Sequence, residues 1–84
     1  MDEDKTLVFD TFDINEEDIY NKLKTIYDNL LERGYNPINQ IVGYIMSGDL
    51  GYISSYKNSR KIMSELDRSM LTELLLRKFL AWDI

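Results

Sequence analysis

The 84-residue chain contains no cysteine and no histidine, and it has one proline and four glycines. The first two absences exclude a disulfide, a thiolate nucleophile, a histidine general base and every zinc site built from these residues. The glycines form neither a phosphate-binding loop with its lysine nor a dinucleotide-binding pattern. We therefore expect no enzymatic activity, no metal and no cofactor.

Long apolar runs are also missing. No segment approaches the ~20 consecutive apolar residues that a membrane-spanning helix needs, and the N-terminus does not read as a signal peptide. The sequence thus predicts a cytoplasmic protein that does not insert into a membrane. A single domain of this length lies near the lower limit for a stable core without disulfides or metal, which favours help from a second chain.

The net charge of −5 is unevenly distributed along the chain. Residues 1–18 hold eight acidic residues and one lysine, whereas the remainder is slightly basic. Residues 1–14 also lack the spacing of an amphipathic helix. We interpret residues 1–14 as a flexible acidic N-terminal segment and residues 15–84 as a helical domain. An acidic leader repels phosphates, so the charge disfavours a nucleic acid partner.

The first predicted helix begins at Asn15, a suitable N-cap because three acidic residues follow it in the first turn. Gly34 can adopt the left-handed conformation that ends a helix. Between them, apolar residues at intervals of four, three and four predict a helix to about Arg33, with the buried positions Ile19, Leu23, Ile26 and Leu30.

A second, short helix should begin at Pro37, because Asn36 is a good N-cap and proline fits the first helical position. Gly48 followed by Asp49 should end it. Gly43 in its interior suggests that another backbone approaches closely. The apolar residues of this helix that we expect to be buried are Ile38, Ile41, Val42, Ile45 and Met46.

The remaining sequence predicts a third helix from about Tyr56 and a break near Asp67, which can cap a last helix. That last helix carries more apolar residues than a small monomer can bury, so part of it should contact another chain. The predicted fold is all-α: a compact bundle of about four helices, one or two of them short, completed by homodimerisation. The residues that we assign to core or dimer packing are Tyr44, Leu75, Phe79 and Trp82.

A short helix, a turn with glycine and a following helix also fit a small helix-turn-helix-like DNA-binding protein. Lys57, Arg60 and Lys61 would then lie on the recognition helix. The acidic leader argues against this interpretation, and so does the connection from Ser47 to Ser54, which is longer than the usual turn. A small DNA-binding protein is therefore the alternative function that the sequence suggests.

One segment, GYNPINQIVGYIMSGD at residues 34–49, closely resembles the signature of the IreB family, small regulatory phosphoproteins of Gram-positive bacteria. The resemblance covers most of the chain, because it includes Tyr52-Ile53, Ser59-Arg60, Asp4-Lys5-Thr6 and Phe9.

The resemblance implies an all-helical cytoplasmic homodimer without catalysis. It also implies phosphorylation on an N-terminal threonine by a membrane-anchored Ser/Thr kinase, with a cognate phosphatase as a further partner. Such a protein modulates cell-wall stress and antibiotic resistance signalling through a downstream protein that the sequence does not identify. The residue in the phosphoacceptor position is Thr6. Some relatives carry a second threonine three positions earlier, where this chain has Glu3, so we expect one site.

A basic group in the chain could receive the phosphate. Lys57, Arg60 and Lys61 have the spacing that places three cations on one helix face, where charge-assisted hydrogen bonds can hold a phosphate. Phospho-Thr6 docked on this face, in the same chain or across a dimer, would act as a switch. The alternative is a solvated basic face that pairs weakly with Glu65 or with the acidic leader.

Overall fold

The structure is a computed structural model that describes the backbone of residues 2–81 and the side chains of residues 16–81. All regular structure in this part of the chain is helical, which confirms the predicted all-α class. None of its helices is long and apolar enough to cross a membrane. In chain order the elements are α1 (Asp2–Glu32), α2 (Pro37–Ser47), the 3₁₀ turns η1 (Leu50–Tyr52) and η2 (Tyr56–Asn58), α3 (Ser59–Ser64) and α4 (Arg68–Leu80).

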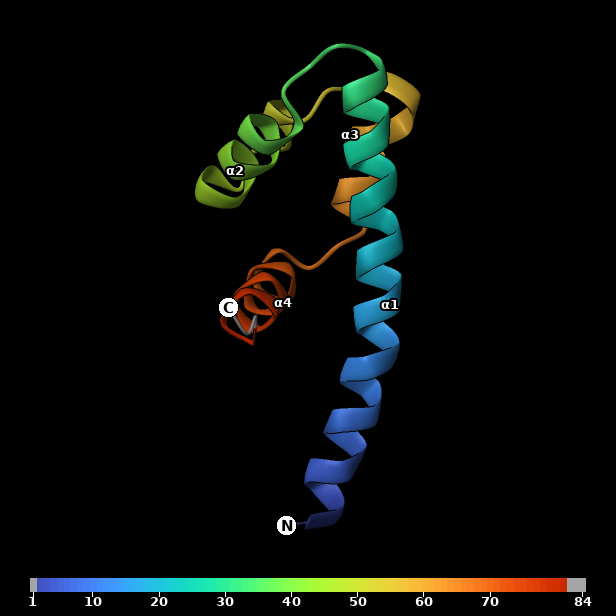
Figure 1. The fold of residues 1–84 in the computed structure, drawn as a ribbon, viewed down its shortest axis with the longest axis vertical. Helices are drawn as coiled ribbons and strands as arrows, with labels where there is room; N and C mark the ends of the chain where they lie inside the picture. Colours follow the sequence, from blue (N-terminus) through green and yellow to red (C-terminus); the bar gives the residue numbers. More distant parts are fainter. Residues whose placement is uncertain (1, 82–84) are drawn as a thin grey trace.

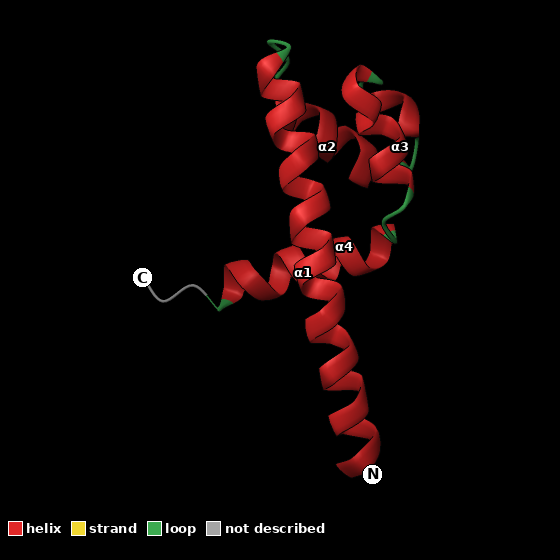
Figure 2. Cartoon of the chain, turned by 90° about the vertical axis from the view of Figure 1, so that its right-hand side faces the viewer, coloured by secondary structure: helices red, strands yellow, loops and turns green. Residues whose placement is uncertain are grey.

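Helix α1 begins at Asp2, so the predicted start near Asn15 was wrong. Residues 1–33 contain neither proline nor glycine, and three acids in the first turn suit the positive end of the helix dipole. The N-terminal part of α1 extends beyond the other helices (Figures 1 and 2). The side chains of residues 1–15 lie outside the described residues, and the flexibility of residues 1–14 stays a prediction.

The predicted boundaries between α1 and α2 are confirmed. Gly34 has a left-handed φ of 89°, and the N–H of Tyr35 donates to the main-chain oxygen of Leu30 over 2.9 Å. Asn36 then caps α2, because its side-chain oxygen accepts from the N–H of Asn39 over 3.1 Å, and proline occupies the first turn. These contacts satisfy main-chain groups that helix ends leave without partners.

The end of α2 and the start of α4 also follow local capping chemistry. Gly48, at φ 75°, ends α2 as predicted, and Asp67 starts α4 by accepting from the N–H of Met70 over 3.0 Å. Between them, Asp49 caps η1 by accepting from Gly51 over 2.8 Å. The third helix is shorter than predicted: α3 begins at Ser59, after η2.

The core of the described residues is one cluster where the other elements meet α1. Helix α4 crosses α1 near its middle (Figure 2), and a salt bridge joins Lys78 of α4 to Glu16. Burying apolar side chains in this way is the main source of stability in a domain of this size. The side chains with no solvent exposure include Ile26 and Leu30 of α1, Ile53 before η2, Met63 of α3 and Leu71 of α4.

Helix α2 buries less of its surface than predicted. Ile41 and Tyr44 are in the core, but Ile38, Val42 and Met46 are 57%, 50% and 80% exposed. The reason is that only one side of this short helix packs against α1 and η1, so the residues on its other side remain open. Apolar side chains left exposed in this way are candidates for contact with another molecule.

Gly43, in the interior of α2, faces a side chain rather than a backbone. A Cβ atom at this position would lie 2.5 Å from Cδ1 of the Tyr52 ring. The prediction of a close backbone approach was therefore wrong, although the physical reason for glycine, lack of space, is the same.

Candidate functional site

Two consecutive residues before α3 have left-handed backbone conformations. Lys57 has φ 50° and Asn58 has φ 65°. This conformation is unfavourable for residues other than glycine, and asparagine tolerates it better than lysine does. Such a turn persists when surrounding contacts fix it.

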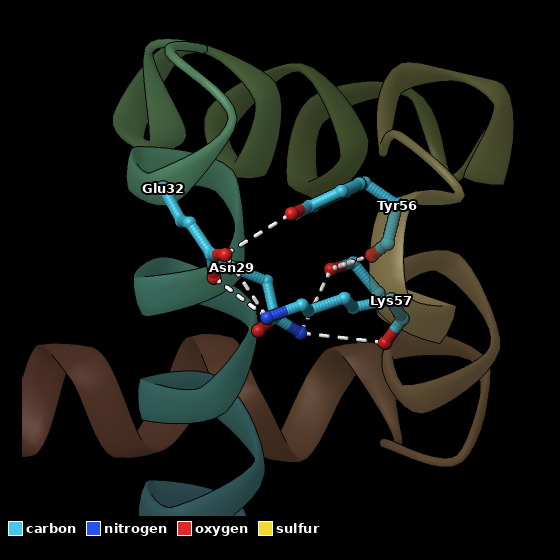
Figure 3. A network of polar contacts seen from close by, with 5 residues as sticks. Asn29, Glu32, Tyr56 and Lys57 are labelled. Atoms are coloured by element: carbon cyan, nitrogen blue, oxygen red, sulfur yellow. Dashed lines mark hydrogen bonds and ion pairs between the residues drawn. The ribbon is translucent and has the colours of Figure 1, made fainter.

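Asn29 of α1 supplies two of these contacts. Its Nδ2 donates to the main-chain oxygen of Lys57 and to the hydroxyl of Ser59, each over 3.3 Å (Figure 3). Ser59 is fully buried and donates in turn to the main-chain oxygen of Tyr56 over 2.7 Å. The amide of Asn29 therefore ties the turn to α1.

Glu32 lies one helical turn after Asn29 on α1. Its carboxylate binds two side chains at the left-handed turn, those of Tyr56 and Lys57. Lys57 Nζ lies 2.8 and 3.0 Å from the two carboxylate oxygens, and the hydroxyl of Tyr56 donates to one of them over 3.1 Å (Figure 3). The Lys57 ammonium, followed by the Tyr56 hydroxyl, holds the pKa of Glu32 below its ordinary value. The Glu32 carboxylate raises the pKa of Lys57 in return.

The predicted basic face is therefore divided. Lys57 precedes α3 and is paired with Glu32, so the prediction that three cations share one helix face was wrong. Arg60 donates from Nε to the main-chain oxygen of Ile53 over 2.8 Å, and Lys61 is exposed beside it on α3. The structure keeps Arg60 and Lys61 together and separates Lys57 from them.

The same geometry weakens the DNA-binding interpretation. Residues 48–58 separate α2 from α3, whereas a helix-turn-helix motif uses a turn of three or four residues. Helix α3 spans only Ser59–Ser64, which is too short to carry a row of base contacts along a major groove. No geometric feature of this segment favours DNA binding over the regulatory phosphoprotein role that the family resemblance implies.

An apolar groove lies between α1, α2 and α4, and it is defined here by Tyr20, Leu23, Tyr27, Ile38, Val42 and Leu75. Its cavity has a volume of about 370 Å³. A second cavity of about 720 Å³ shares three of these residues and continues toward Lys78 of α4. The two cavities adjoin through the shared residues, and their wall is mostly apolar with Glu16, Glu17 and Lys78 lining the second one, which suits a partner surface with an apolar centre.

The residues that we assigned to packing occupy different environments. Tyr44 is in the core, where 7% of it is exposed. Leu75 lines the apolar groove and is 40% exposed, and Phe79 on the same helix is 64% exposed. Trp82 lies outside the described residues.

A protein-family model described as IreB regulatory phosphoprotein matches residues 4–81. The chain belongs to the IreB family. The match covers almost all of the sequence, so it includes the capped helices, the strained turn and the N-terminal part of α1. A regulatory phosphoprotein role is thereby supported for the chain, in agreement with the resemblance noted from residues 34–49.

In this IreB-family chain, Thr6 lies within α1 and inside the matched residues, and its side chain is outside the described part. Our sequence reasoning missed other residues that shape the candidate sites. Asn29 and Glu32 act on a turn more than 20 residues away, and spacing along the chain does not reveal such pairs. The groove residues Tyr20 and Tyr27 had a detectable signal, because two aromatic residues seven apart widen the apolar stripe of α1.

Proposed function

We propose that this protein is a non-enzymatic regulatory phosphoprotein whose Thr6 is phosphorylated by a membrane-anchored Ser/Thr kinase. A cognate phosphatase removes the phosphate. The protein acts in the cytoplasm as a homodimer, and it modulates cell-wall stress and antibiotic resistance signalling by binding a downstream protein. The observation that carries this proposal is the family match over residues 4–81, a range that includes Thr6.

The position of Thr6 suits a phosphorylation switch. It precedes the first core residue, Ile19, in a segment that is already strongly acidic, and phosphate adds about −1.5 to −2 charge at neutral pH. Added negative charge on this segment changes its repulsion from other acidic surfaces and its attraction to basic ones. Modification at this point can therefore alter binding without disturbing the core.

The apolar groove supports the homodimer. Helix α4 carries four exposed apolar residues, of which Leu75 lines the groove, and α2 carries three, of which Ile38 and Val42 line it. A surface of this kind on so small a domain is costly to leave in water, and a two-fold arrangement would let each copy cover the other. The exposed residues concerned are Leu75, Leu76, Phe79 and Leu80 of α4 and Ile38, Val42 and Met46 of α2.

Phosphorylation is tested by incubating the full chain with ATP and the catalytic domain of a membrane-anchored Ser/Thr kinase from the same organism. Intact-mass spectrometry should show one added phosphate. The Thr6→Ala variant should gain none, while the matched control Thr11→Ala should behave like the wild type. Phosphate retained in Thr6→Ala would overturn the assignment of the acceptor.

The homodimer is tested by light scattering on the wild type and on two matched variants. Val42 lies in the groove and is 50% exposed, whereas Leu31 lies outside it and is 49% exposed. Val42→Lys should halve the measured mass because a charge must be desolvated on assembly, and Leu31→Lys should leave it at two subunits. A wild-type protein that runs as one subunit at all concentrations contradicts the dimer but leaves the phosphorylation result untouched.

A further inference from the structure

A small cavity lies between η1, η2 and α3, on a different part of the surface from the apolar groove. Its volume is about 330 Å³. It contains no carboxylate, and all but one of its lining residues can donate a hydrogen bond from the side chain. The lining residues, called the basic cavity below, are Leu50, Ser55, Asn58, Arg60, Lys61 and Ser64.

The two cations of the basic cavity differ from most others in residues 16–81. Arg60 and Lys61 form no salt bridge within that part of the chain, whereas five other cations each bind a carboxylate. Among the described side chains, the Arg60 guanidinium donates one hydrogen bond, from Nε to the main-chain oxygen of Ile53, so no acceptor in residues 16–81 occupies its two terminal nitrogens. The five paired cations are Lys22, Lys24, Lys57, Arg77 and Lys78.

Carboxylates on the neighbouring elements are engaged elsewhere. Glu32 binds Lys57, Glu65 binds Lys22 at 3.4 Å, and the side chain of Asp49 caps η1. The local positive charge is therefore not neutralised from within the described residues. The strained turn contributes to this arrangement, because Lys57 pairs with Glu32 and so takes that carboxylate out of competition for Arg60 and Lys61.

We infer that the basic cavity binds a phosphate monoester carried on a polypeptide, that is, a phosphothreonine or phosphoserine. A phosphate presents three acceptor oxygens and about two negative charges, which match a guanidinium, an ammonium and the hydroxyl of Ser55, while the Ser64 hydroxyl donates to the main-chain oxygen of Lys61 over 2.5 Å. A nucleotide fits less well, because the wall has no aromatic ring for a base and Leu50 is its only apolar residue. A phosphothreonine would place its methyl group against that leucine.

Two polypeptides could supply the ester. One is the acidic N-terminal segment of this protein, phosphorylated on Thr6, from the same or a second copy. The other is a phosphorylated segment of a different protein. Only the first source depends on the proposed function, because it requires phosphorylation of Thr6. Binding of a phosphate ester in the basic cavity does not depend on it.

The test is an NMR titration of the full chain, with amide shifts followed in residues 50–64. The probes are a phosphothreonine peptide with the sequence of residues 2–10, the same peptide without phosphate, a scrambled phosphothreonine peptide and inorganic phosphate. Both phosphopeptides should shift these amides and bind more tightly than inorganic phosphate, and the unphosphorylated peptide should not. Tighter binding of the native than of the scrambled sequence identifies the protein's own segment as the source, and equal binding identifies another protein.

Variants separate binding in the cavity from general attraction to a charged peptide. Lys61→Gln should weaken phosphopeptide binding about tenfold, the effect of one charge-assisted hydrogen bond, and Ser64→Asp should weaken it further by repulsion. Neither change touches the core, since both residues are exposed. Lys24→Gln on α1 is the matched control and should bind like the wild type.

Two results would overturn the inference: no amide shifts with either phosphopeptide, or shifts and affinities that are the same in Lys61→Gln and Lys24→Gln. The scrambled phosphopeptide and inorganic phosphate need no phosphorylation of the protein itself. A failure to phosphorylate Thr6 would therefore contradict the proposed function without deciding whether the basic cavity binds phosphate esters.

Discussion

Arg68, at the start of α4, donates a hydrogen bond from Nη1 to the main-chain oxygen of Ile45 in the last turn of α2 over 3.0 Å. Its guanidinium also packs against Gly48, where a Cβ atom would lie 2.9 Å from Cζ. A cation at this point satisfies a main-chain oxygen that the helix itself leaves unpaired and suits the negative end of the helix dipole. Arg68 thus joins the start of α4 to the end of α2.

Replacing Arg68 by glutamine should therefore lower the free energy of unfolding by about 1 kcal/mol. Urea unfolding followed by circular dichroism measures the change. Lys24→Gln is the control, because Lys24 is exposed and its ion pair with Asp28 and its contact with the Tyr27 ring both lie within α1. An equal loss in both variants would show that Arg68 contributes only a surface charge.

Asn58 provides a prediction about the strained turn. Its φ of 65° suits asparagine and glycine but not alanine. Asn58→Ala should lose about 1 kcal/mol of stability, whereas Asn58→Gly should be neutral or more stable in the same unfolding experiment. If both variants lost the same amount, the cause would be a missing side-chain contact and not the backbone conformation.

The pair formed by Glu32 and Lys57 predicts a dependence of stability on pH. The pKa of Glu32 is lowered from 4.5, so its contribution is present above pH 4.5 and is lost as the pH falls through the lower folded value. The pKa of Lys57 is raised from 10.5, so its contribution is present below pH 10.5 and is lost as the pH rises through the higher folded value.

The stability difference between wild type and Glu32→Gln should therefore be constant from about pH 5 to 10 and shrink at both ends. Thermal unfolding at a series of pH values measures it. Glu17→Gln is the control, since Glu17 is exposed and forms no salt bridge within residues 16–81. A difference that does not shrink below pH 4 would contradict the role of the ion pair.

Helix boundaries set by local chemistry could be predicted from the sequence. Asn36, Pro37, Gly48 and Asp67 act on main-chain groups within three or four residues, so their roles follow from residue type and order. The start of α1 at Asp2 does not follow from periodicity, because the apolar residues before Asn15 are too sparse to mark a continuous helix face. Phe12 nevertheless lies seven residues before Ile19, which continues the spacing of the later apolar positions.

The candidate sites were harder to predict because they depend on residues that are distant in the chain. The left-handed turn at Lys57 is fixed by Asn29 and Glu32 of α1. The side from which α1 packs against α2 likewise decides which apolar residues of α2 remain exposed. The adjacent cations Arg60 and Lys61 were identified from the sequence, but their separation from Lys57 required the fold.

The contact between Gly43 and the ring of Tyr52 leads to the last prediction. Gly43→Ala adds a methyl group 2.5 Å from Cδ1 of Tyr52, so the ring must move and stability should fall by about 1 kcal/mol. In a Tyr52→Ala background the same substitution should instead raise stability by about 1 kcal/mol, because alanine favours a helix interior over glycine.

Urea unfolding of the four proteins in this double-mutant cycle gives the coupling directly, and a change of sign is the expected signature. Tyr52→Phe is the matched control for the background, because phenylalanine keeps the ring and should preserve the loss caused by Gly43→Ala. If Gly43→Ala changed stability equally with tyrosine and with alanine at position 52, the Tyr52 ring would not be what restricts residue 43 to glycine. Close contact between α2 and another protein molecule would then have to explain the glycine at position 43.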